Sequence, residues 1–319
     1  MNSKQILLLI CTGLFSFSFC AQNPPTVQGK DIVLETKTGK IKGTILCPDV
    51  KTQVPVVLLI AGSGPTDRDG NNQMMTNNSL KMLAEELLKN NIASLRYDKR
   101  GIGESKDAGS KEKDLRFDQY VNDAAEWIKL LKADKRFSKV IIAGHSEGSL
   151  IGMIAANQTN PDGYISIAGA GHSADVILKE QLKSQPAAVT GLCYPIIDSL
   201  KKGKTVDSVP QMLYALFRPD VQPYMISWFK YDPQAEIKKL TIPVLILQGT
   251  TDIQVSTDDA QALFNANMKS ELHIIKGMNH VLKEAPEDKQ KNMATYSDPA
   301  LPIKAELMID IVNFVKGIK

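Results

Sequence analysis

Disulfide frameworks, zinc-type ligand spacings and an excess of one charge are all lacking in this sequence of 319 residues. It has four cysteines and four histidines, with no CxxC pair and no two histidines three or four residues apart, so no zinc site is predicted. Only Cys47 and Cys193 lie beyond the amino-terminal segment, and whether they pair stays open. Lys and Arg number 38 against 35 Asp and Glu, a net charge of +3, which does not favour nucleic-acid binding.

Long apolar runs are also lacking, except at the amino terminus, so no stable transmembrane span is predicted. Residues 1–20 combine a positive charge near the start, an apolar stretch over 5–19 and small residues around position 20. This layout predicts a signal peptide and an exported protein, periplasmic or extracellular. A lipid anchor on Cys20 is the alternative, which the bulky Phe19 before it disfavours.

Short apolar runs alternate with helical periodicity, in a chain whose 43% hydrophobic residues suffice for a globular core. The apolar runs predict strands at 32–35, 41–46, 54–60, 92–97, 140–143, 164–168, 244–247 and 272–275. Apolar residues at helical spacing predict helices at 80–88, 118–131, 150–156 and 303–314. Strands that alternate with helices imply crossover connections, so the predicted fold class is α/β, a mostly parallel, doubly wound sheet covered on both faces.

The alternation of strands and helices stops between residues 171 and 240, although a short link would suffice to join the next strand. A helical cap over 172–239 is therefore predicted, inserted into a core made of 21–171 and 240–319. Seven of the nineteen Phe, Trp and Tyr residues fall within 194–231 of this insert. They form either the insert's own small core or the wall of an apolar substrate pocket, for which the candidates are Tyr214, Phe217 and Trp228.

A possible nucleophile stands in Gly144-His145-Ser146-Glu147-Gly148, which fits G-x-S-x-G. The motif directly follows a predicted buried strand and opens a predicted helix, and this context favours a nucleophile elbow with Ser146 at its tip. In such a turn the central residue has strained backbone angles, and its hydroxyl is held over the carboxyl edge of the sheet. The alternative is a glycine-rich turn without a catalytic role.

A serine hydroxyl needs a base to remove its proton, and His280 is the best candidate among the four histidines. It lies in the loop immediately after the last predicted strand, at the same sheet edge as Ser146. His145 is directed elsewhere by the turn, and His273 lies inside the last strand. His172 begins the insert and has no acid partner in the pattern.

The imidazole in turn needs a carboxylate, and Asp252 lies just past the carboxyl end of the predicted strand at 244–247. Asp258 and Asp259 are alternatives, but they fall where the next helix should begin and suit its first turn better. Ser146, Asp252 and His280 then occur in the chain order nucleophile, acid, base.

Negative charge that develops on a substrate oxygen needs two backbone donors, forming an oxyanion hole. The amide of Glu147 is one candidate, since it follows the nucleophile at a helix start. Ser63 is the other, in the loop over 62–65 that follows the first buried strand, where two glycines leave the backbone uncovered for a ligand.

Five motifs in order carry a family resemblance; they are AGSGPTDRDGN at 61–71, YDKRGIGES at 97–105, GHSEG at 144–148, GTTD at 249–252 and NH at 279–280. Together they resemble the bacterial carboxylesterase branch of the α/β-hydrolase superfamily, related to serine-aminopeptidase-like hydrolase domains. The resemblance implies the α/β-hydrolase fold, the triad Ser146, Asp252 and His280, and the oxyanion donors Ser63 and Glu147. The first loop departs from many relatives, which have His-Gly where this chain has Ala-Gly.

Two segments of these motifs, one charged and one containing glycines, have alternative interpretations. Asp67, Arg68 and Asp69 either contact substrate or, as the better interpretation, form a structural ion-pair cluster. Gly101 and Gly103 lack the third glycine of a dinucleotide-binding motif, so the segment is interpreted as a loop-shaping turn and no nucleotide or other cofactor is predicted.

The leading hypothesis is a secreted serine hydrolase that cleaves small-molecule carboxylic esters of short to medium acyl chain through an acyl-enzyme. A peptidase or thioesterase with the same triad is a second hypothesis; a peptidase would need an amine-recognising acid, for which Asp220 and Asp232 are available. A non-catalytic binding protein on a hydrolase scaffold is the third, and a complete triad argues against it. The oligomeric state stays open.

Overall fold

One eight-stranded sheet organises the chain, in the order β1-β2-β4-β3-β5-β6-β7-β8. The computed structural model describes residues 29–109 and 111–319, so the predicted signal peptide and Cys20 lie outside the described residues. The strands are β1 (Lys30–Thr36), β2 (Gly39–Leu46), β3 (Val54–Ile60), β4 (Ala93–Tyr97), β5 (Phe137–His145), β6 (Gly163–Ile167), β7 (Val244–Gly249) and β8 (Glu271–Ile275). From β4 to β8 all neighbours pair in parallel, while the hairpin β1–β2 joins β4 antiparallel. The predicted mostly parallel, doubly wound α/β class is confirmed.

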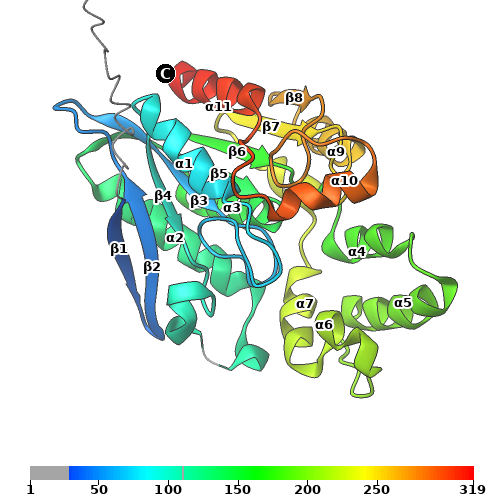
Figure 1. Ribbon diagram of the computed structural model, residues 1–319. Helices are drawn as coiled ribbons and strands as arrows, with labels where there is room; N and C mark the ends of the chain where they lie inside the picture. The colour runs from blue at the N-terminus through cyan, green and yellow to red at the C-terminus, as the bar shows by residue number, and fades with distance from the viewer. Residues whose placement is uncertain (1–28, 110) are drawn as a thin grey trace, which may run out of the picture.

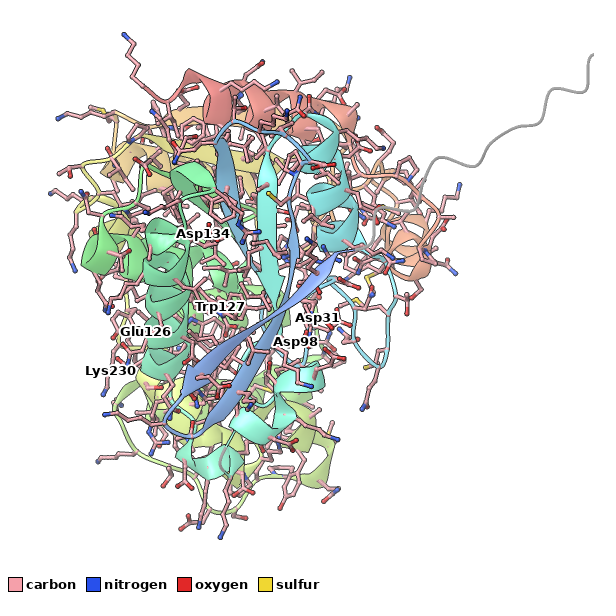
Figure 2. The ribbon with its side chains drawn as sticks, turned by 90° about the vertical axis from the view of Figure 1, so that its left-hand side faces the viewer. Asp31, Asp98, Glu126, Trp127, Asp134 and Lys230 are labelled. Carbon is pink, nitrogen blue, oxygen red and sulfur yellow. The ribbon has the colours of Figure 1, made fainter. Side chains whose placement is uncertain are left out.

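Helices cover both faces of the sheet, because the central strands are apolar on both sides. Alternate residues of β3 enter different clusters: Leu58 packs with α2 and α3, whereas Leu59 packs with α1 and α11. These helices are α1 (Ser79–Lys89), α2 (Phe117–Ala133), α3 (Glu147–Thr159) and α11 (Ala305–Gly317). In Figure 2 the hairpin β1–β2 crosses in front with α2 beside it, where Glu126 is exposed and Trp127 is fully buried.

The segment 172–239 is helical, as predicted for the insert. It holds α4 (Ala174–Leu182), α5 (Ala187–Lys201), η3 (Gln211–Leu213), α6 (Tyr214–Phe217), η4 (Pro219–Val221), α7 (Gln222–Trp228) and α8 (Pro233–Ile237). Figure 1 shows α4 to α7 gathered on one side of the molecule, away from α11. The remaining short elements had weaker patterns and were not predicted in full; they are η1 (Gly103–Ala108), η2 (Glu112–Asp114), α9 (Thr257–Ala266), α10 (Lys289–Ala294) and η5 (Thr295–Ser297).

The insert is anchored on the start of α2 through α7. The buried amide of Phe117 donates to Ser227 Oγ at 2.8 Å, and the Phe117 ring stacks on Trp228 with 6.2 Å between centroids. Tyr224 meets Tyr120 of α2 edge to face at 5.6 Å. The aromatic residues of α7 therefore pack against the core domain, and not only among themselves.

The charged segment after β3 is a set of structural ion pairs. Arg68 donates through its backbone amide and its guanidinium to the Asp98 carboxylate, at 2.8 and 2.7 Å, and reaches Glu104 at 2.6 Å. Asp69 accepts from Arg96 at 2.7 Å. These bonds fix the loop that follows Ser63 to the turn after β4.

Removing the Ser227 hydroxyl tests the anchoring of the insert. Ser227→Ala leaves the buried amide of Phe117 without a partner, so it should lower the free energy of unfolding by about 1–3 kcal/mol. Urea unfolding measures this change. Ser208→Ala, at an exposed position of the same insert, serves as the control and should cost less than about 0.5 kcal/mol. Equal losses in the two variants would contradict the anchoring role.

Candidate active site

The strand–turn–helix at residues 144–148 has the backbone of a nucleophile elbow. Ser146 has φ 55° and ψ −121°, a positive-φ conformation that side chains rarely adopt, between the end of β5 and the start of α3. Glycine is required on both sides, because a Cβ on Gly144 would lie 2.2 Å from the carbonyl oxygen of Gly148. A Cβ on Gly148 would lie 2.3 Å from the carbonyl oxygen of Ile60. The turn thus packs directly on β3 and leaves Ser146 facing the cavity described below.

The predicted acid and base meet at the carboxyl ends of β7 and β8. Asp252 Oδ2 lies 2.8 Å from His280 Nδ1, and both side chains are buried. The other oxygen, Oδ1, accepts the amides of Gln254 and Val255 at 2.8 and 3.0 Å. The two loops can approach this closely because Gly249 has no side chain. A Cβ at this position would lie 1.9 Å from the Met278 carbonyl oxygen.

Electrostatics keep the carboxylate of this pair ionised. Burial alone would raise the pKa of Asp252, but the imidazole of His280 and the two backbone amides outweigh it, so its pKa is lowered below its ordinary value. An ionised Asp252 accepts the Nδ1–H of His280, which leaves Nε2 as the acceptor of a proton. The pair therefore has the tautomer that a general base requires.

The loop of His280 is held next to the elbow by His145. His145 Nε2 lies 2.8 Å from the carbonyl oxygen of His280, and the two rings are 4.8 Å apart. The sequence predicts only that the turn directs the His145 side chain away from Ser146; its contact with the His280 loop is a finding of the structure. Within the described residues Ser146 Oγ forms no hydrogen bond, and no bond to His280 is present. Catalytic hydrogen bonds in ligand-free enzymes often tighten only with substrate.

The two expected oxyanion donors flank Ser146. A Cβ on Gly62 would lie 3.2 Å from Ser146 Cβ, which places the Gly62–Ser63 peptide beside the nucleophile. Ser63 and Glu147 both line the cavity. Among residues 29–109 and 111–319, neither backbone amide has a hydrogen-bond partner. Both N–H groups are therefore free to bind an oxygen.

A cavity of about 630 Å³ lies between the core and the insert and opens on Ser146. Much of its wall is apolar, with contributions from Leu115, Leu150, Ile177, Leu178, Leu216, Val221, Met225 and Trp228. Of the three predicted pocket residues only Trp228 lines it. Phe217 is fully buried in the hydrophobic core, and Tyr214 is 38% exposed at the surface. Tyr224 and Tyr120, which were not predicted, line the cavity instead.

The charged groups of the cavity wall are largely paired within the protein. Lys99 Nζ lies 2.7 Å from Glu147 Oε2, and these side chains are 1% and 2% exposed. Glu147 Oε1 also accepts the Tyr224 hydroxyl at 2.5 Å. The carboxylate of Glu112 pairs with Arg218. The sequence predicts only a loop-shaping turn over residues 98–105, and its one signal for Lys99 is a cation just after a strand.

Two other histidines have acidic partners that sequence reasoning did not provide. His172 Nδ1 lies 3.2 Å from Asp259 Oδ1, where Asp259 also caps α9 through Ser256. His273 lies 3.1 Å from Asp310, in the edge strand β8. His172 lines the cavity but is 46% exposed, whereas the side chains of His280 and Asp252 are 6% and 0% exposed.

Neither a metal-binding cluster nor a membrane-spanning helix is found in the described part of the chain. Among residues 29–109 and 111–319, no three His, Cys, Asp or Glu side chains come together as a metal site. Within the same ranges, no helix has the length and apolar character that crossing a membrane requires. Cys47 and Cys193 are both free thiols.

Comparisons with known proteins come from sequence and from structure. The family described as serine aminopeptidase, S33 matches residues 75–211. Esterase EstD of Thermotoga maritima is 30% identical over 251 residues, which cover 75% of this chain and 55% of that protein. The chain thus spans about half the length of that curated relative.

Solved structures share the fold over almost the whole chain. Est1E from Butyrivibrio proteoclasticus, with ferulic acid bound, matches with a TM-score of 0.61 and 17% identity, over 90% of this chain and 99% of that one. The Pyrococcus furiosus esterase Pf2001 matches with a TM-score of 0.59 and 15% identity, over 92% of this chain and 91% of that one. At these identities the likeness shows the fold alone.

Titration of His145 gives a prediction for stability. Burial, together with the neighbouring His280, lowers the pKa of His145 to about 3. An unfolded histidine titrates near pH 6.5, so the unfolded state gains a proton that the folded state does not accept. Stability from this group is therefore lost as the pH falls from about 6.5 towards 3.

His145→Gln removes this titration and keeps an N–H for the His280 carbonyl. Between about pH 7 and pH 4.5, the wild-type free energy of unfolding should fall by about 2 kcal/mol more than that of the variant. Urea unfolding followed by circular dichroism at both pH values provides the measurement. An equal fall in both proteins would show that His145 is not the source.

Proposed function

We propose that this chain, an α/β-hydrolase of the esterase-like kind, cleaves carboxylic esters through an acyl-enzyme formed on Ser146. The observation that carries the proposal is the buried Asp252–His280 pair, whose loop contacts His145, the neighbour of a strained serine that opens on an apolar cavity. The relation to Esterase EstD supports the same class of reaction.

In the proposed mechanism Ser146 Oγ attacks the ester carbonyl while His280 Nε2 takes its proton. Asp252 holds Nδ1–H and stabilises the imidazolium. The carbonyl oxygen becomes an oxyanion and binds the amides of Ser63 and Glu147. As the tetrahedral intermediate collapses, the ester C–O bond breaks and His280 returns the proton to the leaving alkoxide. Water then repeats the sequence on the acyl-enzyme and releases the carboxylic acid.

The preferred substrates are proposed to be esters with uncharged acyl groups of short to medium length. The apolar wall favours such groups through the hydrophobic effect. An aminopeptidase would need a free carboxylate for the substrate's ammonium group, but the lining carboxylates are Glu112, paired with Arg218, and Glu147, paired with Lys99. Asp220 and Asp232, considered for that role, do not line the cavity. This pairing favours the esterase over the peptidase alternative.

The place of action is proposed to lie outside the cytoplasm. The pattern of residues 1–20, with an early positive charge, an apolar stretch and small residues, supports export. The activity proposed above does not depend on it.

Ser146→Ala tests the nucleophile. Loss of the attacking oxygen should lower kcat for a p-nitrophenyl ester by at least about 10⁴-fold, measured by release of p-nitrophenol. Ser149→Ala is the matched control in the next turn of α3, since its hydroxyl contacts Tyr164 and Ser166 in the core. It should retain kcat within about threefold. A Ser146→Ala variant that keeps most of the activity would overturn the mechanism.

Substrate comparison tests the proposed class. Butanoyl to octanoyl p-nitrophenyl esters should be cleaved with kcat/KM at least about 100-fold above aminoacyl p-nitroanilides, because no free carboxylate in the cavity compensates the buried ammonium. Neutral acyl anilides of the same chain length serve as the control, since they change the bond without adding a charge. Faster cleavage of the aminoacyl compounds would identify a peptidase instead.

A further inference from the structure

Lys99 is a fully buried cation beside the nucleophile, and the proposed mechanism gives it no role. It follows β4 and points its Nζ at two acceptors, the carbonyl oxygen of Gly62 at 2.5 Å and Glu147 Oε2 at 2.7 Å. The ammonium also lies 4.9 Å from the centre of the Tyr120 ring. A buried ion pair of this kind seldom adds net stability over apolar packing, because both ions lose their hydration. Stability alone therefore does not account for this pair.

The contact with Gly62 fixes a peptide plane. No cis peptide bond occurs in residues 29–109 and 111–319, so the Gly62–Ser63 peptide is trans, with its C=O and N–H on opposite edges. Lys99 holds the C=O edge in the protein interior. The N–H of Ser63, which has no partner in the protein, must then point the other way, beside Ser146 and the cavity. Rotation of this peptide would break the bond to Lys99.

The second acceptor of Lys99 ties the other donor to the same point. Glu147 supplies the second oxyanion amide through its backbone and pairs with Lys99 through its side chain. The Tyr224 hydroxyl occupies the remaining carboxylate oxygen, at 2.5 Å. One buried ammonium thus contacts both segments that carry the amides. The distance between the two amides is therefore fixed before substrate binds.

We propose that Lys99 is a positioning residue that orients the Gly62–Ser63 peptide, so that the Ser63 amide joins the Glu147 amide in binding the oxyanion. This inference rests on the proposed esterase function. It assigns to Lys99 no contact with substrate and no proton transfer. Its effect is confined to states in which the substrate oxygen is negatively charged, so it should act on kcat and not on ground-state binding.

Lys99→Met keeps the apolar length of the side chain and removes both hydrogen bonds. It should lower kcat for the preferred p-nitrophenyl ester by about 10–100-fold while KM changes less than about threefold. A trifluoromethyl ketone of the same acyl chain, which adds Ser146 Oγ to give an oxyanion, should lose affinity by the same factor as kcat. The corresponding secondary alcohol, which forms no oxyanion, should bind unchanged.

Asp123→Asn is the matched control, because it breaks the neighbouring buried pair of Arg100 and Asp123 without touching the Gly62 carbonyl. Per folded molecule, it should retain kcat within about threefold. If Lys99→Met does not fold, Lys99→Gln takes its place. Its shorter amide holds the carbonyl less closely, so kcat should fall by about 3–10-fold with the same split from KM.

Unchanged kcat and ketone affinity in the Lys99 variant would overturn the positioning role. Equal losses for the ketone and the alcohol would also overturn it, because they would indicate general disruption of the cavity. Ser146→Ala distinguishes failure of the proposed function from failure of the positioning role. If that variant remains active, the proposed function fails, whereas failure of the Lys99 test alone leaves the esterase mechanism intact.

Discussion

Backbone-to-backbone contact at the carboxyl edge of the sheet is the constraint on which the site depends. Gly148 lies against the carbonyl of Ile60, and Gly249 lies against the carbonyl of Met278, at separations that leave no room for a side chain. These contacts bring together the ends of β3, β5, β7 and β8, which are distant in sequence. Three short loops can then present Ser146, Asp252 and His280 from rigid supports.

Much of this arrangement was predictable because parallel strands carry continuous apolar runs and their carboxyl ends share an edge. The strands, the elbow and the loops of Asp252 and His280 follow from that rule, and the motif-based resemblance agrees with the family match over residues 75–211 and with the similarity to Esterase EstD. The cavity wall was less predictable. Trp228 lines it while Phe217 and Tyr214 do not, because composition locates an aromatic cluster but not the side of a short helix that meets the core.

Long-range polar pairs were the least accessible to sequence reasoning. His172 meets Asp259 and Lys99 meets Glu147, pairs that lie 87 and 48 residues apart and have no local spacing signal. The pairs of Glu147 with Lys99 and of Glu112 with Arg218 leave no free carboxylate in the cavity wall to attract a cationic ligand, whereas Lys106 lines the wall without an ion pair among the described residues. The apolar wall and the paired carboxylates are thus the two features on which the proposed preference for esters over aminoacyl compounds rests.

The hydrogen bond from Tyr224 to Glu147 bears on how substrate reaches the serine. Tyr224 belongs to α7, so movement of α7 away from the core would break this bond and leave Lys99 as the partner of the carboxylate. The same movement would also break the bond between the Phe117 amide and Ser227, which anchors α7 on α2. We therefore expect ligands to enter the cavity while α7 stays packed on α2.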